Sequence, residues 1–284
     1  MRLILSRKGF DSSAGGCPSP VMPDGSLCVL PIPDARSGIR YGDIRAGKRT
    51  LGKLVHDLSG GRVRGGHGAH LDPDIVAPAY PRLAGWRPVL GQAGAAQGHL
   101  RNQGVGEGDL FLFFGVFRQA ELWRRRWRFV PGTRPFHAIW GWLHIGEVVP
   151  VTSETPDRLP WAAYHPHLQG HGDGTDTLYL ASDGVRVSWQ GGVYPGSGVF
   201  PLLEKSQVLT YPDGRLPTQW RLPEAFFPGP DRAPLSYHTK GDRWHHESPW
   251  CYLSCAARGQ EFVLDLDHYA DLPPWIDGLL AKRG

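Results

Sequence analysis

Two long apolar stretches stand out in the middle of the chain, at residues 109–118 and 136–151. Both are rich in Phe, Trp, Leu, Ile and Val and are bounded by Gly, Pro and Asp, which is typical of buried strands. We therefore predict a strand over each stretch. Shorter runs of the same kind predict further strands or extended segments at residues 3–5, 27–32, 177–181, 185–189, 207–211 and 261–264.

Helical patterns are few and short. Residues 51–58, 93–100 and 272–280 each predict one short helix, the last with Pro273 and Pro274 in its first turn, where proline is tolerated. The chain holds 38 Gly and 26 Pro among its 284 residues, a share that disfavours long helices. We expect loops over most of the remainder, including residues 67–85 and residues 86–99 apart from the one or two helical turns over 93–100.

These patterns predict an α+β fold: a strand-rich single domain over residues 1–284 with long Gly/Pro-rich loops. Residues 1–100 form its loop-rich part and residues 101–284 its strand-rich part. The Gly-Asp pair before the first long strand and the Gly-Glu-Val at the end of the second also resemble a PUA-like barrel, a small fold that binds RNA or modified bases. A PUA-like barrel element around 108–150 is therefore an alternative for that region.

Composition and charge narrow the class of protein. Hydrophobic residues make up 40% and charged residues 20%, as in folded globular proteins. No apolar run reaches the roughly 18 residues of a membrane span, and the first residues do not read as a signal peptide, so we expect a cytoplasmic protein without membrane contact. The net charge of +4 permits contact with nucleic acid without requiring it.

The four cysteines do not predict a zinc site. Ten residues separate Cys17 from Cys28, and three separate Cys251 from Cys255, whereas structural zinc sites usually show two tight pairs. We expect reduced, mostly buried thiols.

One short segment of the chain carries a cluster of positive charge. Arginines at 124–126 and 128 alternate with Trp123 and Trp127. Arg pairs with phosphate and Trp stacks on bases, so this segment is a candidate nucleic-acid or substrate surface. A solvated, amphipathic segment explains the same pattern.

The sharpest candidate for metal chemistry is His70-Leu71-Asp72-Pro73-Asp74. A histidine and an aspartate two residues apart in an extended chain point to the same side, which suits two ligands of one metal. A further distant histidine would complete the two-histidine, one-carboxylate set of non-haem Fe(II) enzymes. An ordinary Asp-Pro turn with an unrelated histidine is the structural alternative.

The chain has 13 histidines, which leaves several candidates for the remaining ligands. His165 and His167 flank Pro166 in the same spacing, and His171, Asp173 and Asp176 follow closely. Each of the other candidates also fits a buried, hydrogen-bonded histidine. The full predicted metal set is His70, Asp72, His99, His137, His165, His167 and His238.

A glycine-rich turn after the first strand is the candidate for acid–base and phosphate chemistry. It contains Lys8, Asp11 and Ser12, followed by Gly15 and Gly16. Backbone N–H groups in such turns can hold anions, although the spacing is not that of a Walker loop or a dinucleotide fingerprint. We predict Lys8, Asp11 and Ser12 as catalytic residues. The alternatives are Asp11 as a metal ligand and a plain Asx turn that links two strands.

Several motifs taken in order resemble the nucleotide modification associated domain 3 family. The resemblance extends from residue 1 to about 265 and implies chemistry on a nucleobase or nucleotide. The motifs that carry it are residues 7–12 with Gly15, Gly16 and the prolines at 18 and 20, His70-x-Asp72-Pro73-Asp74, residues 91–100, 108–115 and 137–143.

The favoured function is a metal-dependent enzyme, a non-haem iron oxygenase or oxidase using one Fe(II) ion or more. The chain gives no sign for or against 2-oxoglutarate as co-substrate. The alternatives are a metal-free transferase or hydrolase acting on a modified nucleotide, and a reader of modified bases without enzymatic activity. A small molecule, a nucleotide or a peptide are all open as substrate. The predicted substrate or nucleic-acid contacts are Arg7, Arg124, Trp127 and Trp140.

Overall fold

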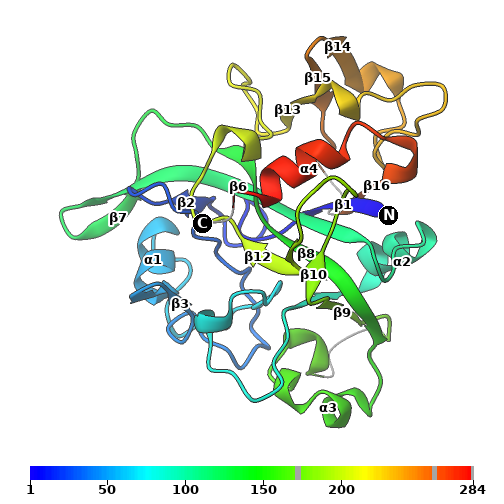
Figure 1. The fold of residues 1–284 in the computed structure, drawn as a ribbon. Helices are drawn as coiled ribbons and strands as arrows, with labels where there is room; N and C mark the ends of the chain where they lie inside the picture. The colour runs from blue at the N-terminus through cyan, green and yellow to red at the C-terminus, as the bar shows by residue number, and fades with distance from the viewer. Residues whose placement is uncertain (170–173, 258–260, 283–284) are drawn as a thin grey trace.

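A large mixed sheet forms the centre of the molecule (Figure 1). The computed structural model describes residues 1–169, 174–257 and 261–282. Within them, the main path of the sheet runs β16-β1-β6-β8-β9-β5, and β2, β7 and β12 pair with β6 or β8. The strands are β1 Arg2–Arg7, β2 Ser19–Val21, β5 Val89–Gln92, β6 Leu110–Trp123, β7 Arg126–Phe129, β8 Phe136–Pro150, β9 Thr177–Ala181, β12 Ser197–Val199 and β16 Glu261–Asp265.

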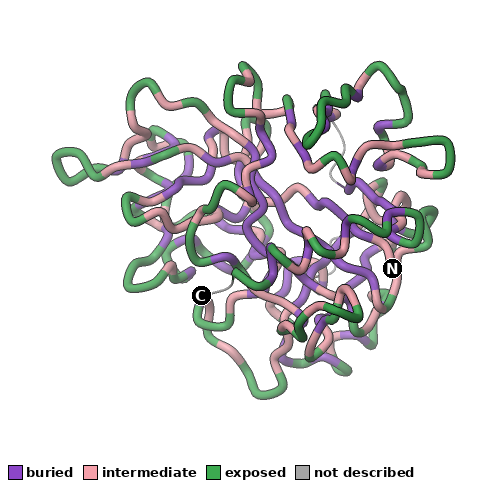
Figure 2. Tube along the Cα trace, turned by 45° about the horizontal axis from the view of Figure 1, so that its top comes forward, coloured by how far each residue is buried: buried purple, intermediate pink, exposed green. Residues whose placement is uncertain are grey.

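The central strands are apolar at consecutive positions because both faces of the sheet are covered. In β1, Leu3 and Leu5 pack into one buried cluster and Ile4 into another, and β6 divides Leu112 and Phe113 in the same way. Successive side chains of a strand point to opposite faces, so a strand buried on both sides needs an apolar residue at each position. Figure 2 shows the buried residues running along these strands, with exposed residues in the peripheral loops.

A small antiparallel sheet and the last helix cover one face. The sheet has the order β13-β15-β14, from β13 Gln219–Pro223, β14 Trp244–Glu247 and β15 Trp250–Ser254. The helix is α4, Pro273–Leu280. Ile276 of α4 and Trp220 of β13 belong to the same apolar cluster as Leu3 and Leu5.

Short elements of the N-terminal part pack together beside the large sheet. These are the hairpin of β3 Arg45–Ala46 and β4 Arg49–Thr50, and α1 Leu51–Leu58. Leu54 and Val55 of α1 share a cluster with Trp127 of β7, and Asp57 accepts the Trp127 backbone N–H at 3.0 Å. The remaining elements are α2 Gly94–Asn102, α3 Thr155–Arg158, β10 Gly184–Val185 and β11 Tyr194–Pro195.

The predicted strand-rich α+β architecture is confirmed. Both long strands form, as do the three predicted helices and the strands at 177–181 and 261–264. The barrel alternative is wrong: β6 and β8 lie in an open sheet whose path ends at β16 and β5, and the described strands close no barrel. None of the described helices has the length and apolar character needed to cross a membrane.

Three local predictions are wrong. Residues 207–211 make only single bridges, through Val208 and Thr210. The stretch 185–189 forms a strand only at Val185. Residues 89–92, predicted as loop, form β5 because their backbone pairs with β9 over all four residues.

Candidate metal centre and adjoining cavity

The segment His70–Asp74 lies beside the edge strand β5, and this pairing positions its side chains. Asp74 forms a backbone bridge with Val89, and the Gly91 backbone N–H donates to Asp72 Oδ1 at 2.6 Å. The peptide bond between Asp72 and Pro73 is cis. The bridge at Val89 and the hydrogen bond from Gly91 hold Asp72 at a fixed place against the edge strand β5.

His70, Asp72 and His167 come together at this place. One ligand atom from each lies within 4.8 Å of the others. His167 comes from the short turn after Pro166, which contacts β5, and its Nε2 is 3.9 Å from Asp72 Oδ2. The rings of His70 and His167 meet edge to face with centroids 5.2 Å apart. Two imidazoles and one carboxylate at this spacing could hold a single metal ion.

Each of the two histidines is oriented by a carboxylate of its own. His70 Nδ1 lies 3.0 Å from Asp34 Oδ2, and His167 Nδ1 lies 2.6 Å from Asp176 Oδ1. These bonds use one nitrogen of each ring and leave Nε2 for a ligand. Metal-binding histidines commonly have such an outer carboxylate, which fixes the tautomer and the orientation of the ring.

The surroundings of Asp72 favour its carboxylate form. Burial alone raises the pKa of Asp72, but His165, Lys8 and His167 together hold it below its ordinary value. His165 Nε2 is 3.3 Å from Asp72 Oδ1. His165 is fully buried, and neither of its ring nitrogens has a hydrogen-bond partner among the described residues. Burial also lowers the pKa of His167, although Asp72 and Asp176 act against this, so the neutral, ligating imidazole is favoured.

A second buried polar group borders this centre. Lys8 Nζ lies 3.3 Å from Glu261 Oε1, which also accepts from Ser6 Oγ at 3.1 Å and Gln92 Nε2 at 2.5 Å. Burial raises the pKa of Glu261, and Lys8 and Ser6 offset part of that effect. Glu261 Oε2 is buried without a partner among the described residues.

An ion pair between Asp74 and Arg82 fixes the end of the segment His70–Asp74. Asp74 is fully buried and accepts from both Arg82 Nη1 and Nη2 at 2.5 Å, and from Tyr164 Oη at 2.5 Å. Tyr164 directly precedes His165 in the chain. This contact therefore ties the segment of Asp72 to the segment that carries His165 and His167.

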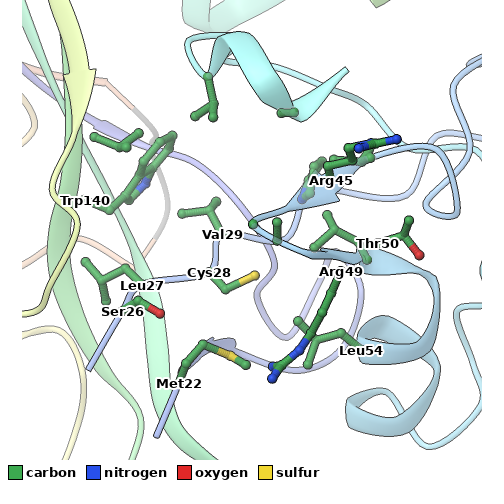
Figure 3. Close-up of a pocket in the computed structure, with 18 of the residues that line it drawn as sticks. Met22, Ser26, Leu27, Cys28, Val29, Arg45, Arg49, Thr50, Leu54 and Trp140 are labelled. Carbon is green, nitrogen blue, oxygen red and sulfur yellow. The ribbon is translucent and has the colours of Figure 1, made fainter. Parts of the chain in front are cut away.

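A cavity of about 1100 Å³ adjoins the centre. Asp72 and Trp140 contribute to its wall, as do Leu122 and Trp127 of the β6–β7 hairpin. Figure 3 shows Trp140 on one side and Arg45 and Arg49 on the opposite side, with Cys28 and Val29 between them. The Nε1 of Trp140 is buried and has no partner among the described residues.

Four of the seven predicted metal ligands are not part of the cluster: His165 lies beside Asp72 without joining it, and the other three have different partners. His99 Nε2 pairs with Ser236 Oγ at 2.9 Å. His137 Nδ1 accepts from Trp220 Nε1 at 2.9 Å. His238 uses both nitrogens on the backbone, with Nδ1 2.9 Å from the Ser236 oxygen and Nε2 accepting from the Ala256 N–H. Burial lowers the pKa of His137 to about 3 and that of His238 to about 4, as expected of structural histidines.

In the glycine-rich segment, Asp11 and Ser12 belong to a plain Asx turn, whereas Lys8 lies at the candidate centre. Asp11 Oδ1 accepts from the Ser13 N–H and Oγ and from the Ala14 N–H, which is an Asx turn, and Ser12 is exposed on it. Lys8, in contrast, is largely buried and lies beside Asp72 and Glu261. Arg7 donates to the Ala257 oxygen at 3.2 Å.

The three remaining substrate candidates have different surroundings. Arg124 is exposed at the β6–β7 turn, whereas Trp127 and Trp140 are buried and line the cavity.

Two carboxylates near the centre were not predicted. Asp34 is 36 residues from His70, and nothing in its local sequence marks it. Glu261 opens the apolar run of β16, and a charge at the start of a buried strand is the signal that could have singled it out. Asp176, predicted beside His171 and Asp173, orients His167, whereas His171 and Asp173 lie outside the described residues.

Comparisons with known proteins place the chain in a family. Neither the curated proteins nor the solved structures contain a match. One family model matches residues 2–265, nearly the whole chain. The chain therefore belongs to the nucleotide modification associated domain 3 family.

Proposed function

We propose that this protein is a metal-dependent enzyme of nucleotide modification in which His70, Asp72 and His167 bind one Fe(II) ion. The observation that carries the proposal is the set of three ligand atoms within 4.8 Å of one another, next to a cavity. Two imidazoles and a carboxylate are the protein ligands of non-haem Fe(II) oxygenases and leave coordination positions open.

The outer carboxylates support the same proposal. Asp34 and Asp176 hold the two imidazoles with their Nε2 atoms available, and the Gly91 N–H holds one oxygen of Asp72 while leaving the other. Fe(II) would supply oxidation chemistry with dioxygen at this place. The chain's own residues would orient the ligands and place the substrate in the cavity beside Asp72.

A metal-free mechanism using Lys8 and Asp11 is less favoured. The Asp11 carboxylate is used by its own turn, and Lys8 pairs with Glu261 instead. Lys8 and His165 lie close to Asp72, so they are the groups best placed to hold or move a proton at the edge of the centre.

The metal content of protein purified anaerobically without a metal-binding tag tests the proposal. We expect about one equivalent of iron and its loss in His167→Ala and Asp72→Ala. His99→Ala is the matched control and should keep its iron, because His99 lies outside the cluster. Melting temperatures of all variants show whether each one is folded.

Two results would count against iron chemistry at this site. Full iron occupancy in a folded His167→Ala variant would show that the ligands are elsewhere. Zinc or manganese in place of iron would favour hydrolysis by a metal-bound water.

A further inference from the structure

Positive charge gathers on the β3–β4 hairpin at one side of the cavity. Arg45, Lys48 and Arg49 all line the cavity and are exposed to solvent. Arg45 and Lys48 form no ion pair with any described carboxylate, and the Arg49 guanidinium lies over the Trp127 ring at 5.1 Å. The strand β4 leads into α1, where Lys53 is neutralised by Asp57 at 2.8 Å.

The β6–β7 hairpin adds a second group of cations. Its cross-strand pair Leu122 and Trp127 lines the cavity, and the turn residues Arg124 and Arg125 lie just beyond, followed by Arg126. All three arginines are exposed, and none pairs with a carboxylate among the described residues. Trp123 is 49% exposed and is covered by the guanidinium groups of Arg124 and Arg128.

The two hairpins are neighbours in space. Trp127 of β7 touches Arg49 of β4, and its backbone N–H donates to Asp57 of α1. In Figure 1, β7, α1 and β3 lie on the same side of the molecule. Arg45, Lys48 and Arg49 at the cavity, together with Arg124, Arg125 and Arg126 at the end of the neighbouring hairpin, are here called the cationic rim.

The turn of the second hairpin is unusual in its residues. Arg124 and Arg125 have φ values of 46° and 68°, the left-handed region that both positions of a two-residue type I′ turn require. Asn and Gly adopt this conformation far more readily than Arg. Two arginines here place positive charge at the end of a projecting hairpin, at a cost to the turn.

We propose that the cationic rim binds the phosphates of a nucleic-acid strand and that the cavity receives one nucleotide of that strand. Six cations spread over two hairpins match a run of phosphates better than the phosphate of one free nucleotide. The cavity of about 1100 Å³ is roomy for a base and its sugar, and it leads from the rim to Trp140 and Asp72.

This inference names the substrate of the proposed enzyme and rests on the proposed function for what happens to the nucleotide. The binding itself needs no metal. Fluorescence anisotropy with a labelled 12-nucleotide single-stranded DNA, measured at several salt concentrations, tests it directly. A mixture of the four 2′-deoxynucleoside 5′-monophosphates serves as competitor.

We expect the double variants Arg124→Asn/Arg125→Gly and Arg45→Ser/Lys48→Ser each to bind the DNA at least tenfold more weakly. The slope of log affinity against log salt concentration should fall by about one for each phosphate that a variant no longer neutralises. Arg215→Ser/Lys240→Ser removes the same charge from exposed positions that do not line the cavity and should bind like wild type. The monophosphates should compete at least 100-fold less well than the strand.

Three results would overturn the inference: unchanged binding by both rim variants, an equal weakening in the control variant, or monophosphates that compete as well as the strand. The Asn-Gly variant keeps the turn geometry, so weaker binding there does not reflect unfolding. Metal content is measured separately. A metal-free protein that binds DNA through the rim would contradict the proposed function alone, and an iron-loaded protein that ignores DNA would contradict this inference alone.

Discussion

Gly91 lies directly against the imidazole of His167, so closely that a Cβ atom on Gly91 would overlap the ring. The same glycine donates its N–H to Asp72. Gly91→Ala should therefore push His167 away from Asp72 and weaken metal binding about 10- to 100-fold, the range seen when a group that supports a ligand is removed. Titration of the metal-free protein with Fe(II) under anaerobic conditions measures this.

A glycine at which an added Cβ atom has open space around it provides the control for Gly91. A Cβ on Gly98 of α2 would meet no atom within 4 Å, so Gly98→Ala should leave metal affinity unchanged. Equal metal affinity in Gly91→Ala and wild type would mean that His167 is not a ligand in its present position.

The carboxylates that orient the two histidines should affect metal affinity almost as much as the ligands themselves. Asp34→Asn and Asp176→Asn keep the size of the side chain but remove the charge that orients His70 and His167. We expect each to lower metal affinity about 10- to 100-fold with little change in melting temperature. Asp183→Asn, an exposed aspartate, is the matched control. If Asp34→Asn and Asp176→Asn both bind metal normally, the two histidines do not act as a metal pair.

The buried pair of Asp74 and Arg82 should be the most sensitive point of the site for stability. Asp74→Asn leaves the Arg82 charge without its carboxylate in a buried place, which costs about 3–5 kcal/mol of unfolding free energy. Glu204→Gln breaks the exposed pair with Lys282 and should cost only about 0–1 kcal/mol. Urea unfolding of the two variants gives both values, and equal effects would contradict the role assigned to burial.

Acid should destabilise the fold through His137 and His238. Burial lowers their pKa values to about 3 and about 4, whereas an unfolded histidine titrates near pH 6.5. The unfolded chain therefore binds more protons in the interval between these values, and stability is lost as the pH falls from about 6.5 toward 4. Each histidine contributes at most about 1.4 kcal/mol per pH unit.

Unfolding free energies of wild type, His137→Gln and His238→Gln between pH 4.5 and 7.5 measure this effect. Each substitution removes one titrating group, so the slope should be smaller in both variants. Parallel curves for all three proteins would assign the acid sensitivity to other groups.

The β6–β7 turn should be more stable without its arginines. Arg124→Asn/Arg125→Gly relieves two left-handed L-residues, which should raise the unfolding free energy by about 1 kcal/mol or more. Thermal or urea unfolding measures the change, with Arg126→Ser as the control that removes charge outside the turn. A destabilised double variant would mean that the arginines hold the hairpin through contacts of their own.

Much of the central sheet is predictable because its strands are apolar throughout. β6 and β8 are recognisable by composition, whereas β5 is not, since it is short and contains Gly91 and Gln92. β14 contains two histidines and a glutamate, three exposed residues in succession that give no strand signal. These short strands exist through backbone pairing with a partner, which no local pattern records.

The residues of the site were likewise predictable only where a local pattern marks them. The spacing of His70 and Asp72 singled them out, and the spacing of His165 and His167 did likewise. His99, His137 and His238 fit the same residue-type argument, but their nitrogens are used by Ser236, Trp220 and the backbone. Asp34 and Glu261 reach the centre only through the tertiary fold, so a single sequence cannot assign them to it.

The position of β1 between β6 and β16 sets the order in which the protein is completed during synthesis. β1 is synthesised before both of its partners, because its parallel partner β6 begins at residue 110 and its antiparallel partner β16 begins at residue 261. Ser6 and Lys8 meet Glu261 across 255 and 253 positions of chain, so closing this contact is among the slowest steps to expect. A nascent chain therefore contains His70, Asp72 and His167 well before Glu261 is made, and the centre with its neighbouring polar group is complete only after residue 261 has been synthesised.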